Sequence, residues 1–333
     1  MASVVGIGNP LMDFIMHSSY QTLDHFNAKP GTMHLVERPV VDSILSFHKD
    51  PMILAGGSAA NTLRGLAWLC EQSCTDDELF YFGAVGKDDF GDAFQNILKD
   101  QGVNSYLGRK ETPTGVSGIL VTPDFERTMF TFLGACRDFS EADLDLDIVC
   151  SARYIYIAGY MWDTENQKKS ITMSVKSARS CGVQVAFDLA DPFVICRSGE
   201  ELKKWIPGNV DILFANVEEL SMMADMKAEN KEGYDLLLKS SESLAPIIVM
   251  KTGAAGCKIL YKDKIISVPG NKVKPLDTTA AGDSFAGGFL YGMLREYSPS
   301  ECGRLANLLA SRIVTVEGCN YAALEKNTFN LSS

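Results

Sequence analysis

The chain has 333 residues, of which 46% are hydrophobic, 22% charged and 9% aromatic, a composition typical of a folded globular protein and not of a disordered or fibrous one. Its 31 basic and 42 acidic residues give a net charge of −11 with no Lys- or Arg-rich stretch, so we expect no nucleic-acid partner. No apolar run approaches the roughly 20 residues of a membrane span, and the N-terminal residues carry no basic signal region, so we expect a cytoplasmic protein without membrane contact.

Short apolar, β-branched runs recur along the chain and predict buried strands. These runs are residues 3–8, 80–86, 154–158, 183–189, 210–215 and 247–251. Apolar residues at helical spacing between them predict helices over 89–100, 165–180 and 281–295, the first with Asp88 as its N-cap. The alternation of strand and helix favours a three-layer α/β sandwich with a mostly parallel central sheet.

Two stretches interrupt this alternation. Residues 20–54, and a hairpin of 115–122 with 127–133, are interpreted as strands that have no place in a βαβ series. We expect them to form a small β lid, made by segments of about 14–54 and 105–135, on a single domain that spans residues 1–333.

Cysteine and histidine usage excludes several classes of site. The nine cysteines are scattered without a CxxC pair, so we expect buried thiols in a reducing compartment and neither a disulfide framework nor a zinc knuckle. All four histidines lie within the first 48 residues and none are paired at i,i+4, which argues against a His-based zinc site. No histidine follows Ser58, so its resemblance to a nucleophile elbow does not predict a serine hydrolase.

The strongest chemical signal is a run of small residues directly before the helix expected at 281. The backbone N–H groups of Ala280, Ala281 and Gly282 would lie at the positive end of the helix dipole and form an anion hole. Asp283, beside that hole, suits a general base that takes a proton from an attacking hydroxyl. An Asp that only stabilises the first turn of the helix is the alternative.

A second segment, Gly56-Gly57 with Asn61, precedes another helical run. Gly57 lets a small ligand approach the backbone, and Asn61 can both donate to and accept from a sugar hydroxyl. Asp13, after the first strand, can accept hydrogen bonds from two vicinal hydroxyls. For each of these residues a turn, packing or capping role is the alternative.

These segments resemble a known family. Gly56-Gly57-x-x-x-Asn61 and Asp277-Thr278-x-x-Ala281-Gly282-Asp283 resemble the two signatures of the ribokinase-like (PfkB) carbohydrate kinases, over essentially the whole chain. Asn216-x-x-Glu219 and the run from Lys251 to Gly256 are similar to two further motifs of that family. Residues 8–13, 55–57 and 126–136 are similar to its adenosine-kinase-like branch.

The resemblance implies an α/β sandwich with a β lid that uses ATP and Mg2+ to phosphorylate a primary hydroxyl. It implies Asp283 as the base, with the amides of Ala280, Ala281 and Gly282 as the anion hole. It also implies that Asp13, Gly57 and Asn61 anchor the ribose hydroxyls, that Glu219 with Asn216 organises the water shell of Mg2+, and that Thr252, Gly253 and Gly256, together with Asn216, line the nucleotide.

Three further residues are candidates with open alternatives. Arg137 follows the lid and would contact a polar or phosphorylated substrate; a surface ion pair with Asp138 or Glu141 is the alternative. Tyr160 would wall an aromatic base, with ordinary core packing as the alternative. Asp188, at the end of a predicted strand, is interpreted as a loop cap.

The leading hypothesis is an ATP-dependent adenosine kinase that makes AMP. The alternative is a kinase for ribose, fructose or a 2-keto-3-deoxy sugar acid. A non-catalytic nucleoside or sugar sensor is a third hypothesis, because Ala280 stands where the family usually has Gly and resists a left-handed conformation; retention of Asp283 argues against it. A requirement for K+, and a monomer or a homodimer as the oligomeric state, stay open.

Overall fold

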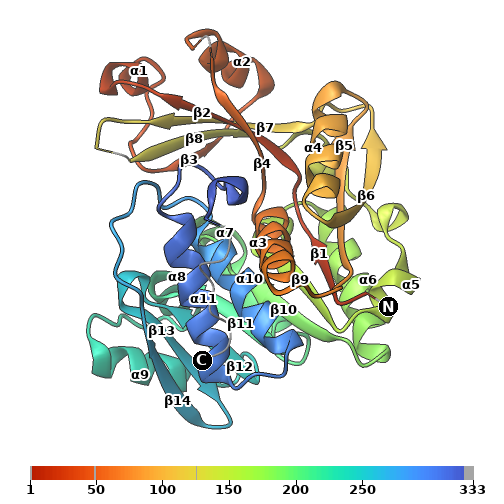
Figure 1. Cartoon of the computed structure of the whole chain (residues 1–333), viewed down its shortest axis with the longest axis vertical. Helices are drawn as coiled ribbons and strands as arrows, with labels where there is room; N and C mark the ends of the chain where they lie inside the picture. The colour runs from red at the N-terminus through yellow and green to blue at the C-terminus, as the bar shows by residue number, and fades with distance from the viewer. Residues whose placement is uncertain (1, 49, 125, 326–333) are drawn as a thin grey trace.

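The computed structural model describes residues 2–48, 50–124 and 126–325, and two β-sheets share this chain (Figure 1). The larger sheet has nine strands, which in spatial order are β14 (Lys264–Pro269), β13 (Gly256–Tyr261), β12 (Ile247–Lys251), β11 (Ile212–Asn216), β10 (Gln184–Asp188), β9 (Tyr154–Ala158), β1 (Val4–Ile7), β5 (Leu79–Gly86) and β6 (Val103–Lys110). The strands from β12 to β6 run parallel, and the β13–β14 hairpin adds an antiparallel edge. The predicted mostly parallel sheet is therefore confirmed.

Helices cover both faces of the large sheet. One face carries α3 (Ser58–Ser73), α4 (Asp89–Asp100), α10 (Ala281–Leu294) and α11 (Pro299–Ile313), and the other carries α5 (Leu146–Ser151), α6 (Glu165–Ser180), α7 (Pro192–Trp205), α8 (Val217–Met223) and α9 (Lys231–Ser240). Each face of the large sheet packs against its helices in a separate hydrophobic core. Because successive side chains of a strand point to opposite faces, Val4 packs in the first core and Val5 in the second. The helices predicted over 89–100 and 165–180 are confirmed, and Asp88 caps α4 by accepting a 2.9 Å bond from the Gly91 amide.

The second sheet, which we call the small sheet, has five strands. In spatial order they are β3 (Met33–Leu35), β8 (Arg127–Phe132), β7 (Gly115–Val121), β2 (Leu11–His17) and β4 (Met52–Gly56). Two short helices, α1 (Tyr20–His25) and α2 (Arg38–Ser46), lie above it in Figure 1, and α2 packs on β7 and β8. One face of the small sheet is thus covered, and the other turns toward the large sheet.

The small sheet differs at its borders from the lid segments expected from sequence. It begins at β2, before residue 14, because the chain enters it three residues after leaving β1. Residues 103–110, part of which were expected in the lid, instead form β6, which pairs in parallel with β5. The reason is that β5, α4 and β6 make one more βαβ unit, which keeps β6 in the large sheet.

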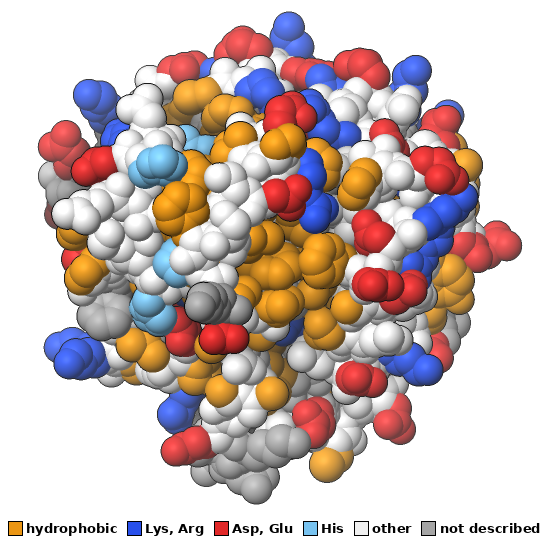
Figure 2. Space-filling model, turned by 90° about the horizontal axis from the view of Figure 1, so that it is seen from above, with side chains coloured by type: hydrophobic (Ala, Val, Ile, Leu, Met, Phe, Trp, Pro, Cys, Tyr) orange, Lys and Arg blue, Asp and Glu red, His pale blue; other side chains and the backbone are white. Residues whose placement is uncertain are grey.

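The surface above the small sheet is mixed. Viewed from that side, hydrophobic side chains gather near the centre of the face, among acidic and basic ones (Figure 2). Large exposed hydrophobic residues in the first part of the chain are Tyr20, Leu35, Phe47, Met52 and Ile53. Across the described ranges, no helix is both long and apolar enough to cross a membrane.

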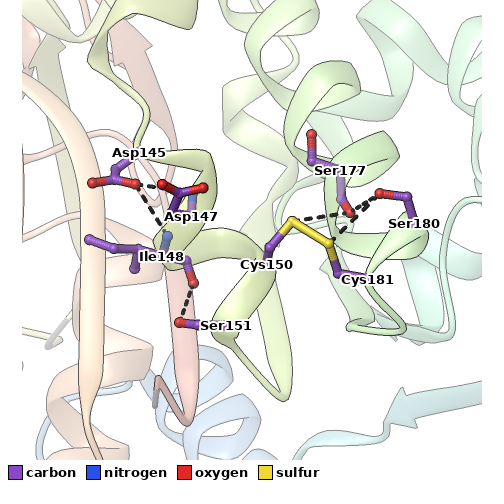
Figure 3. The surroundings of a disulfide bond; sticks show 8 residues. All are labelled: Asp145, Asp147, Ile148, Cys150, Ser151, Ser177, Ser180 and Cys181. Atoms are coloured by element: carbon purple, nitrogen blue, oxygen red, sulfur yellow. Dashed lines mark hydrogen bonds between the residues drawn. A yellow bond between two sulfur atoms is a disulfide. The ribbon is translucent and has the colours of Figure 1, made fainter.

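A disulfide joins Cys150, near the end of α5, to Cys181, directly after α6 (Figure 3). The prediction of thiols was wrong for this pair. Packing of α5 against α6 brings the two Cα atoms to 5.4 Å, within disulfide reach, and a separation of 31 residues in sequence does not reveal that proximity. Of the remaining cysteines, Cys74 and Cys196 are exposed; the buried ones, as expected, are Cys70, Cys136, Cys257, Cys302 and Cys319.

Candidate active site

A cavity of about 300 Å³ lies between the two sheets, at the edge where the parallel strands end. Open α/β sheets bind ligands at this edge, where loops and helix N-termini converge. Its floor, built on the large sheet and its helices, includes Gly57, Ser58, Asn61, Asp188, Lys251 and residues 278–283. Its roof, built on the small sheet, includes Leu11, Asp13, Met33, Leu35, Ser117, Ile119, Met129, Thr131 and Leu133.

The N-terminus of α10 forms one corner of the floor. Ala280 is its N-cap and has φ 55° and ψ 13°, a left-handed conformation. The turn therefore does require the backbone geometry that Ala resists, at a cost of roughly 1–2 kcal/mol. Ala281 donates a 3.3 Å bond to the Thr278 carbonyl, and the amide of Gly282 belongs to the first helical turn, which lacks intrahelical acceptors. Ala280, Ala281 and Gly282 all line the cavity.

Asp283 follows these residues and is held by two side chains from α3. Ser58 donates to one carboxylate oxygen at 2.7 Å, and Asn61 donates to the other at 3.0 Å. Removal from bulk water raises the pKa of Asp283 to about 6, and the bonds from Ser58 and Asn61 act against this rise. Asp283 is thus a fixed carboxylate whose pKa is suited to accept a proton near neutral pH.

The helix that supplies these donors begins at a second special turn. Its N-cap, Gly57, has φ 91°, and a Cβ there would lie 2.1 Å from the Asn9 carbonyl oxygen, so glycine is required. Asn61 was predicted to meet ribose hydroxyls, but its amide nitrogen faces Asp283 and its oxygen accepts a 3.0 Å bond from buried Arg64. Both ends of the Asn61 side chain therefore bond to protein, which suits positioning of Asp283.

Asp13 projects from β2 in the roof and is only 9% exposed. Gly56 on the neighbouring strand makes room for it, since a Cβ at Gly56 would lie 2.2 Å from the Asp13 carboxylate. Burial raises the pKa of Asp13 to about 7, against the lowering effect of the Arg127 and Arg64 charges. A buried carboxylate at the cavity wall is expensive to maintain, and such groups cluster at functional sites.

The sequence interpretation missed an ion pair in the floor. The Nζ atom of Lys251, at the end of β12, lies 2.9 and 3.1 Å from the two carboxylate oxygens of Asp188, at the end of β10. Asp188 also accepts the Ala190 amide at 3.0 Å, so its predicted loop-cap role is confirmed. The positions of both residues at the ends of predicted parallel strands were the available signal that they meet.

The roof is mainly apolar, and aromatic side chains stand at one end of the cavity. Met33, Ile119 and Met129 supply apolar surface from three strands of the small sheet. Tyr160, expected to wall an aromatic base, lines the cavity, and its hydroxyl donates a 3.1 Å bond to Asp191. Phe193 also lines the cavity and is 46% exposed. These two aromatic side chains offer surface against which a flat ring can pack.

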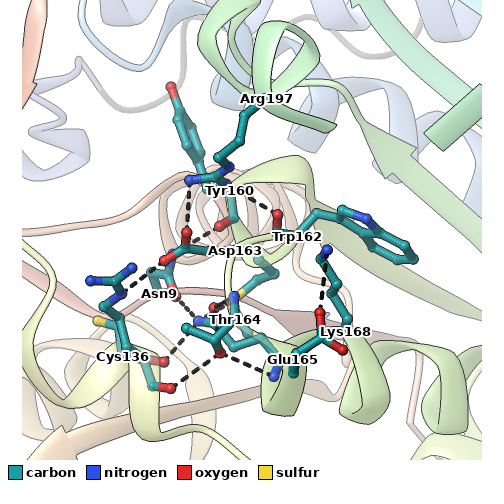
Figure 4. Close-up of polar contacts among 12 residues, drawn as sticks. Asn9, Cys136, Tyr160, Trp162, Asp163, Thr164, Glu165, Lys168 and Arg197 are labelled. Carbon is teal, nitrogen blue, oxygen red and sulfur yellow. Dashed lines mark hydrogen bonds and ion pairs between the residues drawn. The ribbon is translucent and has the colours of Figure 1, made fainter. Parts of the chain in front are cut away.

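Two arginines converge on Asp163 next to Tyr160 (Figure 4). Arg197 donates to one Asp163 oxygen at 2.7 Å and lines the cavity, whereas Arg137 donates to the other at 2.9 Å. Arg137 is outside the set of lining residues, and its side chain is 55% exposed. The structure therefore does not bring Arg137 to the cavity. Arg137 instead forms a surface ion pair, the alternative considered above, but its partner is Asp163 and not Asp138 or Glu141.

Asn216 and Glu219 form a capping box at the start of α8. Glu219 is 2% exposed and accepts two 2.7 Å bonds from Asn216, one from its amide nitrogen and one from its backbone. Burial raises the pKa of Glu219, while the nearby Lys251 charge lowers it. Among the described residues, no three His, Cys, Asp or Glu side chains converge as a metal cage. Asn216 and Glu219 lie outside the residues that line the cavity, and both Glu219 oxygens accept bonds from Asn216, so these residues could hold Mg2+ only through its waters.

Thr252, Gly253 and Gly256 make the turn from β12 into β13, through the 3-10 segment η4 (Gly253–Ala255). All three lie outside the residues that line the cavity, although the turn starts directly after Lys251. Gly253 has φ 62°, and a Cβ there would point into open space. Gly256 has φ 104°, and a Cβ there would lie 2.2 Å from the Val268 carbonyl oxygen. The turn is exposed at Gly253, next to the floor.

One buried ion pair ties the roof to the floor. Arg127, at the start of β8, pairs with Asp277 and donates to Thr279, just before α10. The two charged side chains are 9% and 4% exposed. The sequence interpretation placed both residues in motifs but gave neither this role, because a contact across 150 residues has no local signature.

Comparisons with known proteins agree with this geometry. Residues 48–327 match the model of the pfkB family carbohydrate kinases. Adenosine kinase 2 of Arabidopsis thaliana is 25% identical over 98% of this chain and 97% of its own length. The crystal structure of a probable sugar kinase from Rhizobium etli CFN 42 superposes with a TM-score of 0.88 at 30% identity, covering 96% of this chain and 94% of that one. Adenosine kinase from Sinorhizobium meliloti gives a TM-score of 0.86 at 29% identity, covering 96% and 95%.

Proposed function

The chain belongs to the pfkB family of carbohydrate kinases and is a nucleoside or sugar kinase, and we propose that its acceptor is the primary 5′-hydroxyl of adenosine, which it converts to AMP. The observation that carries the proposal is the union, in one cavity, of a held carboxylate at a helix N-terminus with an apolar roof and an aromatic end. A volume of about 300 Å³ suits a nucleoside.

In this proposal each half of the cavity has its own task. Asp283 takes the proton of the acceptor hydroxyl, whose oxygen attacks the γ-phosphorus of ATP, and ADP leaves. The Ala280–Gly282 turn receives the charge of the transferring phosphoryl group. Asp13 accepts the ribose hydroxyls, and the purine lies between the apolar roof side chains and Tyr160. Glu219 and Asn216 would hold Mg2+ through its waters, and the ion would supply charge neutralisation at the phosphates.

A sugar acceptor is the second candidate. Two observations favour it: the similarity to a protein named as a probable sugar kinase, and Arg197, a cation at the cavity wall that a sugar acid would attract. The apolar roof argues the other way, because a hydroxyl-rich sugar gains little from contact with Met and Ile side chains.

An acceptor panel tests the proposal. Purified protein is assayed with Mg-ATP and adenosine, inosine, ribose, fructose or 2-keto-3-deoxygluconate, in KCl and in NaCl. We expect kcat/KM for adenosine to exceed the others at least about tenfold. The Asp283→Asn variant, prepared identically, is the control for contaminating kinases. Preference for a sugar overturns the proposal, and tight binding in a thermal-shift assay without any turnover would identify a sensor.

A further inference from the structure

Asp188 caps the loop after β10, but that role needs no lysine partner, and the buried Lys251–Asp188 ion pair calls for another explanation. Both side chains line the cavity, yet they are only 15% and 2% exposed. Removal of two charges from water is costly, and apolar residues of similar size often serve stability as well or better. A buried pair in the wall of a ligand cavity is therefore better explained by what enters the cavity than by the fold.

The Lys251 ammonium stands beside the turn that precedes α10. A Cβ built on Gly282 would lie 3.4 Å from Nζ, so the charged group reaches the open side of that glycine. The N-terminus of α10 already carries partial positive charge. Two positive groups thus share one corner of the cavity, beside the Asp188 and Asp283 carboxylates, and an anion at that point would meet both.

We propose that Lys251 is a phosphate-binding residue: Asp188 holds its ammonium group in place, and the remaining N–H group binds the transferring phosphoryl group of ATP. An ammonium has three N–H donors, and the two bonds to Asp188 leave one for a phosphoryl oxygen. Although burial alone lowers the pKa of Lys251, the Asp188 and Glu219 carboxylates outweigh it, so the residue is cationic. The inference rests on one part of the proposed function, the use of ATP as phosphate donor. It does not depend on which acceptor is phosphorylated.

The neighbouring strand provides a matched control. Lys258 on β13 pairs with Asp235 at 2.6 Å and is likewise buried, at 8% exposure, but neither residue lines the cavity. Both pairs join a buried ammonium to a carboxylate, but Asp235 is 40% exposed where Asp188 is 2% exposed, and only the Lys251–Asp188 pair faces the cavity. A purely structural role predicts that loss of either lysine affects folding alone.

The test compares Lys251→Met, Lys251→Arg and Lys258→Met. Steady-state kinetics with adenosine are measured beside the Kd of the Mg2+ complex of the non-hydrolysable β,γ-imido analogue of ATP. For Lys251→Met we expect kcat to fall about 10²–10³-fold, the effect of one lost donor to a transition-state oxyanion, with KM for adenosine within about twofold. The Kd of the analogue should weaken about tenfold or more, and Arg should restore part of both losses.

Several outcomes overturn the inference: kcat and analogue Kd in Lys251→Met within about threefold of wild type, or equal losses in Lys258→Met. If Lys251→Met does not fold, the Lys251→Met/Asp188→Asn double variant, which leaves no unpaired carboxylate, carries the same comparison. Wild type that is inactive on adenosine but binds the analogue refutes the proposed acceptor alone, and the binding comparison still decides the role of Lys251.

Discussion

The floor and the roof of the cavity are built from different kinds of structure. The floor is the edge of a parallel sheet that is buried on both faces, and its Lys251, Asp188 and Asp283 side chains are fixed by ion pairs and hydrogen bonds. The roof is a smaller sheet covered on one face, and it offers mainly apolar side chains with one carboxylate, Asp13. Rigid charge suits transfer of a phosphoryl group, and an adaptable apolar surface suits choice of the acceptor. We therefore expect floor variants to lower kcat and roof variants to raise the acceptor KM.

The largest effect on kcat should come from Asp283, the proposed general base in the floor. Asp283→Asn keeps the shape and the bond from Ser58 but cannot accept a proton, so we expect kcat to fall about 10²–10⁴-fold. Adenosine binding, measured by thermal shift, should stay within a few-fold of wild type. Near-normal turnover would remove Asp283 from the mechanism.

The next largest effect should come from the Arg127–Asp277 ion pair, which connects the roof to the floor. Arg127→Met leaves Asp277 buried without its cationic partner, which should destabilise the fold by about 3–5 kcal/mol. The Arg127→Met/Asp277→Asn double variant should recover much of that stability, while kcat/KM stays low because the roof is no longer tied to the α10 turn. Arg295→Met, which breaks the partly buried pair with Asp77 outside the cavity, is the control. Full activity in the double variant would contradict this coupling.

Asp13 is the sharpest probe of the roof. Asp13→Asn removes charge-assisted hydrogen bonds to ribose hydroxyls, so we expect the KM for adenosine to rise about 10- to 100-fold with kcat nearly unchanged. Asp42→Asn, at an exposed position of α2 in the same region, should change neither. An unchanged KM in Asp13→Asn would assign Asp13 to structure.

The pH dependence of KM and kcat should distinguish the roof from the floor within the wild-type protein. Each carboxylate acts in its ionised form, present above its pKa and lost below it. With pKa values of about 6 for Asp283 and about 7 for Asp13, KM for adenosine should rise already below pH 7, and kcat should fall about tenfold per unit below pH 6. Asp13→Asn should abolish the first limb and keep the second. Rates that stay flat to pH 5 would refute both assignments.

The smallest effect is expected at Ala280. Ala280→Gly relieves the left-handed strain at φ 55°, so it should raise the free energy of unfolding by about 1 kcal/mol and change kcat by no more than a few-fold. Urea unfolding and steady-state kinetics measure the two quantities. If turnover instead rose by about a hundredfold or more, Ala280 would be disrupting the anion hole.

The features predicted from sequence are those with a local signature. The α4 and α6 boundaries follow from caps and apolar spacing, and the α10 turn follows from a run of small residues. The pairing of Arg127 with Asp277 was not predicted, since it joins residues 150 positions apart without a shared signal. The pairing of Lys251 with Asp188, 63 positions apart, was missed although both residues end predicted parallel strands. Asn61 was identified as a site residue, but its orientation toward Asp283 depends on how α3 packs against α10.

Strand β1 has a consequence for how the chain is made. Its Val4 pairs with Leu79 of β5 on one side and with Tyr154 of β9 on the other. Three residues after β1 ends at Ile7, the chain becomes β2, an inner strand of the small sheet. On the ribosome, the first apolar segment must therefore wait for more than 150 residues of synthesis before its second neighbour exists. During that interval the apolar β1 segment is exposed to aggregation and to chaperones. Completion of both sheets, and of the cavity between them, is therefore a late event in folding.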